Sequence, residues 1–128
     1  MALRTTVSTD QAPAAIGAYS QAIRTGSLLF CSGQVALDPS TGELVKEDVA
    51  GQTRRCLENL SAVCDAAGAS LSQAVRCTVY LADMDDFARM NEAYQGFFEL
   101  DDPPARVAIG VAALPRGADV EIDAIVAL

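Results

Sequence analysis

The sequence predicts an α+β fold in which two helices pack on one face of a mostly antiparallel mixed sheet. Two segments carry apolar residues at helical spacing, and the segments around them show the alternation or the continuous apolar runs of strands. Two helices cover only one face of such a sheet. The length of 128 residues fits one domain, which we place over residues 1–128.

The first elements are a hairpin and a loop. Residues 21–24 and 28–32 are two strand-like runs separated by Thr25-Gly26-Ser27, a spacing typical of a β-hairpin. The run Asp38-Pro39-Ser40-Thr41-Gly42 has the composition of a loop.

Two helices and a strand follow. Apolar residues recur at helical spacing from Val49 to Ala67, with Asp48 as a candidate N-cap and Gly68 as a stop. Residues 75–81 alternate as in a strand. Asp83 is the candidate N-cap of a second helix. Its predicted buried face consists of Met84, Phe87, Met90, Tyr94, Phe97 and Phe98.

The C-terminal segment, residues 103–125, predicts two further strands joined by a Pro/Gly turn. Residues 28–31 and 124–128 are apolar on both faces, which is typical of strands buried on both sides. Because the helices cover one face, we expect the other to be covered by further copies of the chain in a closed ring.

Composition excludes several classes of function. A net charge of -8 argues against nucleic-acid and anionic membrane partners, which are polyanions. The absence of histidine excludes Ser-His-Asp and Cys-His nucleophiles and histidine-ligated metals. The cysteines Cys31, Cys56, Cys64 and Cys77 form no CxxC motif, so we expect no metal and interpret them as buried apolar residues. Without an apolar N-terminal core or membrane span, we expect a cytoplasmic protein.

Two charged residues stand among apolar neighbours in the C-terminal strands. Arg106 lies at a strand start, and its guanidinium is a fork that fits a carboxylate. Glu121 lies on the next strand, where partial burial would raise its pKa and allow proton transfer. Together they indicate acid/base chemistry on a small organic acid.

Five motifs resemble those of the reactive intermediate deaminase family, also called Rid or YjgF-like. They occupy residues 14–22, 31–34, 52–60, 104–106 and 114–122, in the family's order and spacing. The resemblance implies a chorismate-mutase-like fold and a homotrimer with clefts between subunits. It also implies a cofactor-free 2-iminobutanoate/2-iminopropanoate deaminase, which hydrolyses 2-aminoacrylate or 2-iminopropanoate to pyruvate and ammonia.

The resemblance assigns a role to six residues. Arg106 would bind the substrate carboxylate, and Glu121 would orient or activate water. Tyr19, Ser32, Gly33 and Asn91 would line the cleft. Ala18 stands where the family usually has proline, which frees the loop before Tyr19.

Each of these residues also has a structural interpretation. Arg106 can pair with a carboxylate in an interface, and Glu121 can be a solvated residue that shares its face with Asp119 and Asp123. Tyr19 can pack in the core, Ser32 can serve only as a turn hydroxyl, and Asn91 can be an ordinary helix-surface residue.

Three alternatives to the deaminase stay open. One is a non-catalytic metabolite-binding or holdase-like protein of the same fold, and another is a deaminase of a different enamine acid, such as 3-aminoacrylate. The third is an RNA nuclease, against which the acidic charge and the missing histidine argue.

Overall fold

Six strands form one sheet whose order differs from their order along the chain. The computed structural model describes residues 3–99 and 101–128. The strands are β1 (Thr5–Val7), β2 (Ala22–Thr25), β3 (Leu28–Val35), β4 (Ala74–Leu81), β5 (Ala105–Gly110) and β6 (Val120–Ala127). They lie in the order β1-β2-β3-β6-β4-β5, and only β4 and β5 are parallel. This confirms the predicted mixed, mostly antiparallel sheet and its hairpin.

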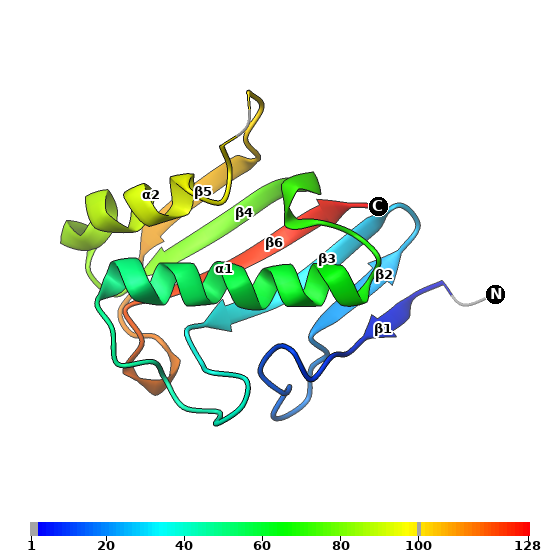
Figure 1. The fold of residues 1–128 in the computed structure, drawn as a ribbon, viewed down its shortest axis with the longest axis horizontal. Helices are drawn as coiled ribbons and strands as arrows, with labels where there is room; N and C mark the ends of the chain where they lie inside the picture. Colours follow the sequence, from blue (N-terminus) through cyan, green and yellow to red (C-terminus); the bar gives the residue numbers. More distant parts are fainter. Residues whose placement is uncertain (1–2, 100) are drawn as a thin grey trace.

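Both helices, α1 (Val49–Ala66) and α2 (Phe87–Gln95), pack on the same face of this sheet, as predicted (Figure 1). The caps of α1 are also as predicted. Asp48 accepts a hydrogen bond from the Gly51 N–H at 3.0 Å, a cap that contributes about 1 kcal/mol. Gly68 takes a positive φ of 75° just beyond the helix, a conformation that glycine adopts without a steric penalty.

The second helix begins later than predicted. Asp83 does cap a helix, but this is the 3-10 turn η2 (Met84–Asp86), where its side chain accepts from the Asp85 N–H at 2.9 Å. The α-helix starts at Phe87, and Phe97 and Phe98 lie in the turn after Gln95. Met90, Tyr94 and Phe98 of the predicted face are buried, and Phe87 and Phe97 are partly buried. Met84 was wrongly predicted to be buried: it lies in η2, before the α-helix, and is 47% exposed.

Two predictions about strands were wrong or incomplete. The two C-terminal strands, predicted to be joined by a Pro/Gly turn, are both present, but β4 lies between β5 and β6 and pairs with both. The segment between them includes the 3-10 turn η3 (Pro115–Gly117) and joins non-adjacent strands. The short edge strand β1, which pairs with β2, was not predicted.

The register assigns Arg106 and Glu121 to opposite faces of the sheet. Arg106 pairs with Cys77, which is fully buried beneath the helices. Glu121 pairs with Tyr80, three residues further along β4, and side chains that are an odd number of positions apart in a strand point to opposite faces. Glu121 therefore points away from the helices.

Both helices lie on the other face (Figure 1), so among the described residues no α-helix covers the face that carries Glu121. Phe30, Val107 and Ile109 lie on this face, and each exposes about two-fifths of its surface. Within the described residues, neither helix combines the length and apolar character needed to cross a membrane.

Candidate active site

Glu121 lies in a cavity of about 620 Å³ at the end of β3 and the start of β6. The cavity is bordered by the loop before β2, by β3 and by η3. Its lining residues are Pro13, Ala14, Ile16, Tyr19, Ser32, Gly33, Gln34, Val35, Leu37, Pro115, Arg116 and Glu121. Four of the six residues predicted for the site, Tyr19, Ser32, Gly33 and Glu121, thus lie together.

The Glu121 carboxyl is half-buried and closely packed. Its pKa is raised, first by partial burial and second by the negative charge of Asp123. A Cβ placed on Gly33 would overlap the Glu121 Oε2 and lie 3.0 Å from its Cδ. Only glycine at this position leaves room for the carboxylate.

The predicted acidic face is smaller than the pattern indicated. Asp123 shares the face of Glu121 and accepts a hydrogen bond from the Tyr80 hydroxyl at 2.9 Å. Asp119 does not share it, because it lies before β6. There its carboxylate accepts from the Gln52 side chain, and its N–H donates to the same side chain, both at 2.9 Å.

Ser32 stands at an irregularity of the β3–β6 pairing, between Cys31 and Gln34. Its hydroxyl donates to the Ser20 carbonyl at 2.6 Å, and its N–H donates to the Gln21 carbonyl at 2.9 Å. With its proton committed, the hydroxyl retains acceptor lone pairs. Ser32 is therefore suited to accept a hydrogen bond from a ligand N–H, not to donate one.

Tyr19 is 53% exposed, so it is a wall of the cavity and not a core residue. The loop before it is held by the buried side chain of Gln21. The Gln21 amide nitrogen donates to the carbonyls of Thr9 and Pro13 at 3.0 and 2.8 Å, and its oxygen accepts from the Thr9 N–H at 2.7 Å. These contacts position the loop without the proline that is usual before Tyr19.

Arg106 and Asn91 lie in a second cavity, of about 400 Å³, beside α2. The Arg106 Nη1 donates to the Asn91 Oδ1 at 2.6 Å. Within residues 3–99 and 101–128, no carboxylate lies within 4.0 Å of the Arg106 guanidinium. Arg106 thus forms no ion pair with the described residues of its own chain, and the interpretation that it pairs with a carboxylate across an interface stays a prediction.

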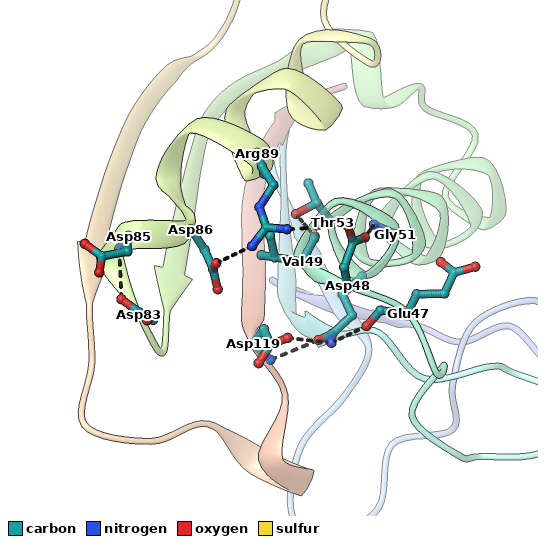
Figure 2. Close-up of polar contacts among 11 residues, drawn as sticks. Glu47, Asp48, Val49, Gly51, Thr53, Asp83, Asp85, Asp86, Arg89 and Asp119 are labelled. Carbon is teal, nitrogen blue, oxygen red and sulfur yellow. Dashed lines mark hydrogen bonds and ion pairs between the residues drawn. The ribbon is translucent and has the colours of Figure 1, made fainter.

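Arg89, on α2, differs from Arg106 in that it contacts two carboxylates of its own chain. Figure 2 shows its guanidinium between Asp86 and Asp48, at 3.1 and 3.9 Å. Its charge is thus balanced within the chain, at the N-terminal end of α1. The same view shows the contact of Asp119 with the start of α1, which anchors the residues just before Glu121.

The four cysteines are buried and free, as predicted. Burial raises the pKa of Cys56, and it raises the pKa of Cys77 to about 11. The pKa of Cys31 is also raised, first by its hydrogen bond with Cys64 and then by burial. The same hydrogen bond lowers the pKa of Cys64. Cys31, Cys56 and Cys77 are buried thiols with raised pKa values, and such thiols are poor nucleophiles. No group of three or more acidic or thiol side chains in the described part of the chain is arranged to hold a metal ion.

The structure adds residues that the sequence did not single out. Arg116 lines the Glu121 cavity, donates to the Gly42 carbonyl at 2.5 Å and has a φ of 63°, the only positive φ among non-glycine residues described. Tyr94 lines the Arg106 cavity. Its helical spacing identified it only as a buried residue, and no sequence signal placed it beside Arg106.

Comparison with known proteins identifies the family. The family model described as Endoribonuclease L-PSP matches residues 9–128. The mouse 2-iminobutanoate/2-iminopropanoate deaminase is 49% identical over 96% of this chain and 90% of its own. The crystal structure of RidA from a Psychrobacter species has a TM-score of 0.92 at 44% identity and covers 97% of this chain and 99% of that one.

A second solved structure, Escherichia coli TdcF with bound serine, has a TM-score of 0.92 at 40% identity, with 97% and 98% of the two chains covered. Both solved structures resemble the chain in sequence and in fold. The fold is chorismate-mutase-like, and in this chain it consists of two helices on a six-stranded sheet. The chain therefore belongs to the reactive intermediate deaminase (Rid) family, whose model carries the description Endoribonuclease L-PSP.

Proposed function

We propose that this protein is a hydrolytic deaminase of reactive 2-imino and enamine acids. Its substrates would be 2-aminoacrylate and its tautomer 2-iminopropanoate, and its products pyruvate and ammonia. The observation that carries the proposal is the contrast between two residues. Arg106 is a guanidinium with no carboxylate of the described residues within 4.0 Å, and Glu121 is a half-buried carboxyl with a raised pKa. The name of the mouse relative and the serine bound to TdcF support an amino-acid-like ligand.

The site is completed by a second copy of the chain. The sheet separates Arg106 from Glu121 in one chain, because their side chains point to opposite faces. Apolar side chains, among them Phe30 and Ile109, are exposed on the face that carries Glu121. A ring of three copies would cover this face and bring the arginine cavity of one copy to the glutamate cavity of the next.

Each residue has a defined part in the reaction. Arg106 binds the substrate carboxylate through two parallel N–H donors, and Asn91 holds its Nη1. Ser32 accepts a hydrogen bond from the imine N–H through its free lone pairs. Tyr19 forms the wall of the cavity beside the substrate. These contacts hold the imine carbon toward Glu121.

Hydrolysis then needs only water and proton transfers. An enamine first takes a proton at C3 and becomes the iminium, C=NH2⁺. Water adds to C2 while the Glu121 carboxylate accepts a proton from it, which leaves a neutral carbinolamine. Glu121 returns that proton to the nitrogen, and the C–N bond breaks while the carbinolamine hydroxyl gives its proton to the Glu121 carboxylate. Ammonia and the 2-oxo acid are then released, and Glu121 loses the proton to solvent. A positioned acid or base contributes about 10²–10⁴-fold, which suffices because the reaction in water is already fast.

The test is the release of pyruvate and ammonia from enzymatically generated 2-iminopropanoate. We expect the wild-type protein to accelerate hydrolysis over the uncatalysed rate and the Arg106→Ala variant not to, although it keeps its oligomeric state. Arg89→Ala is the matched control, because Arg89 is paired within its own chain. No acceleration by folded wild-type protein, across several imino acids, would favour the metabolite-binding or holdase-like alternative.

Assays of the same purified protein test two other activities, the hydrolysis of 3-aminoacrylate and the cleavage of RNA. A faster turnover of 3-aminoacrylate than of 2-iminopropanoate would assign the protein to a different enamine acid. The description of the family model also calls for an RNA-cleavage assay. We expect no cleavage, because the net charge is -8 and the chain has no histidine to act as acid or base.

A further inference from the structure

One face of α2 surrounds the guanidinium of Arg106. The Arg106 Cζ lies 4.9 Å from the centroid of the Tyr94 ring and 5.5 Å from that of Phe87, both within the range of a cation–π interaction. Asn91 accepts from its Nη1. Phe87, Asn91 and Tyr94 are separated by four and three positions, so they share one face of the helix.

Tyr94 is the fixed member of this group. It is 5% exposed, and its ring centroid lies 4.7 Å from that of Phe98 in a tilted arrangement. Burial raises the pKa of its hydroxyl, so the ring stays neutral at physiological pH. Arg106, by contrast, is exposed on the edge strand β5, where a long side chain samples many rotamers unless something holds it.

All the groups that hold Arg106 are uncharged. Arg55 and Arg89 each form an ion pair with a carboxylate of their own chain. Arg106 has an amide and two aromatic faces instead, and no carboxylate of the described residues lies within 4.0 Å. A carboxylate there would orient the guanidinium but would also compete with an anionic ligand. Aromatic rings orient it and leave its charge available.

We propose that Tyr94, assisted by Phe87, is a positioning residue that holds the Arg106 guanidinium ready to bind a carboxylate. This deepens the proposed function, on which it rests for the identity of the carboxylate ligand. The rings fix the guanidinium before the ligand arrives, so less rotamer freedom is lost on binding. The ring matters for this role and the Tyr94 hydroxyl does not.

The test compares Tyr94→Leu, which removes the ring, with Tyr94→Phe, which keeps it. The affinity for pyruvate and for its uncharged analogue pyruvamide is measured by NMR titration. We expect Tyr94→Leu to weaken pyruvate binding by about three- to tenfold, with little change for pyruvamide, and Tyr94→Phe to match the wild type. In turnover assays the loss should appear in KM more than in kcat.

A purely structural role for Tyr94 predicts a different pattern. Equal losses for pyruvate and pyruvamide, equal losses in the Leu and Phe variants, or no loss in either would overturn the proposal. Phe87→Leu is the second variant if Tyr94→Leu fails to fold. Its ring is 0.6 Å farther from the guanidinium, so we expect a smaller loss for pyruvate alone.

A ligand-free measurement separates this proposal from the proposed function. The relaxation of the Arg106 ¹⁵Nε reports how well the guanidinium is ordered. We expect lower order in Tyr94→Leu than in the wild type or Tyr94→Phe, whether or not the protein turns over imines. Unchanged order would refute the role of Tyr94. If Tyr94→Leu lowers the order of the Arg106 side chain but the wild-type protein neither turns over imines nor binds pyruvate, only the deaminase function would be refuted.

Discussion

Arg106 and Glu121 have opposite electrostatic surroundings. Arg106 is exposed, and among the described residues its guanidinium contacts an amide and two aromatic rings, so its positive charge is not balanced by a carboxylate of that part of the chain. Glu121 is half-buried beside Asp123, and both the burial and the neighbouring charge favour its protonated form. One residue is thus suited to hold an anion, and the other, with its raised pKa, to accept and return a proton.

Lysine at position 106 should preserve the positive charge but lose the two parallel N–H donors of the guanidinium. We expect Arg106→Lys to lower kcat/KM by about 10- to 100-fold, because an ammonium is a point charge and makes no bidentate pair. Steady-state kinetics with 2-iminopropanoate measures this. Arg89→Lys serves as the control and should stay close to wild type. Equal activity of Arg106→Lys and wild type would show that the geometry of the guanidinium is not needed.

A methyl group at position 33 should disturb Glu121 while leaving the fold intact. A Cβ there overlaps the Glu121 carboxylate, which is the flexible end of a side chain and can move away at low cost. We expect Gly33→Ala to lose at least about tenfold in kcat, the scale of a mispositioned acid or base, with a small change in Tm. Gly96→Ala is the control, since its Cβ would meet only the Ala93 carbonyl, at 3.4 Å.

Stability should depend on pH through Glu121. Because its pKa in the folded protein is raised, the protonated form favours folding. The stabilisation is complete below the ordinary glutamate pKa of about 4.3 and is lost as the pH rises through the raised value. Glu121→Gln should therefore unfold at a higher denaturant concentration than wild type at pH 8, and this difference should shrink toward pH 4. A constant difference across that range would contradict the assignment.

At the scale of elements, periodicity and capping residues predicted the helices, because these features depend on residues close together in the sequence. The span of α1 followed from its periodicity, with Asp48 and Gly68 at its ends. The later start of α2 was not visible, because Asp83 caps a 3-10 turn as well as it would cap an α-helix. The separation of β5 from β6 depends on β4, which enters between them from elsewhere in the chain. No local pattern carries that information.

The loop that carries Tyr19 should depend on one buried amide. Gln21 supplies hydrogen bonds to the backbone of Thr9 and Pro13, and Gln21→Leu would leave these groups unpaired, at a cost of about 1–3 kcal/mol. We expect faster hydrogen exchange in residues 9–19 and a higher KM. The exposed neighbour Gln11 offers the control, Gln11→Ala. Unchanged exchange in the loop would mean that other contacts hold it.

At the scale of the molecule, the sheet divides the predicted site into two halves. Arg106 and Glu121 stood out in the sequence as charged residues among apolar neighbours, and the resemblance implied their roles. The sequence did not predict that the two side chains point to opposite faces of the sheet. Their orientation follows from the register of β5 and β6 against β4, which no local pattern shows. The need for a second copy was predicted from apolar strands alone, and it stays a prediction.

Mixing two inactive variants tests the divided site. Arg106→Ala and Glu121→Ala chains should each be inactive alone. After random reassembly at equal amounts, a site can take Arg106 from one variant and Glu121 from the other, which restores about a quarter of wild-type activity. The double variant mixed with wild type in the same way should give no such gain over simple dilution. A lack of recovery in verified mixed oligomers would place the complete site within one chain.

In the proposed assembly, the opposite orientation of Arg106 and Glu121 would also make the activity depend on the abundance of the protein. A single chain would then carry no complete catalytic site. Turnover per milligram would not be a constant: below the dissociation constant of the assembly, halving the protein would remove more than half of the rate. Weak expression would thus lower the proposed activity more than in proportion, whereas expression well above that threshold would make it insensitive to moderate fluctuations.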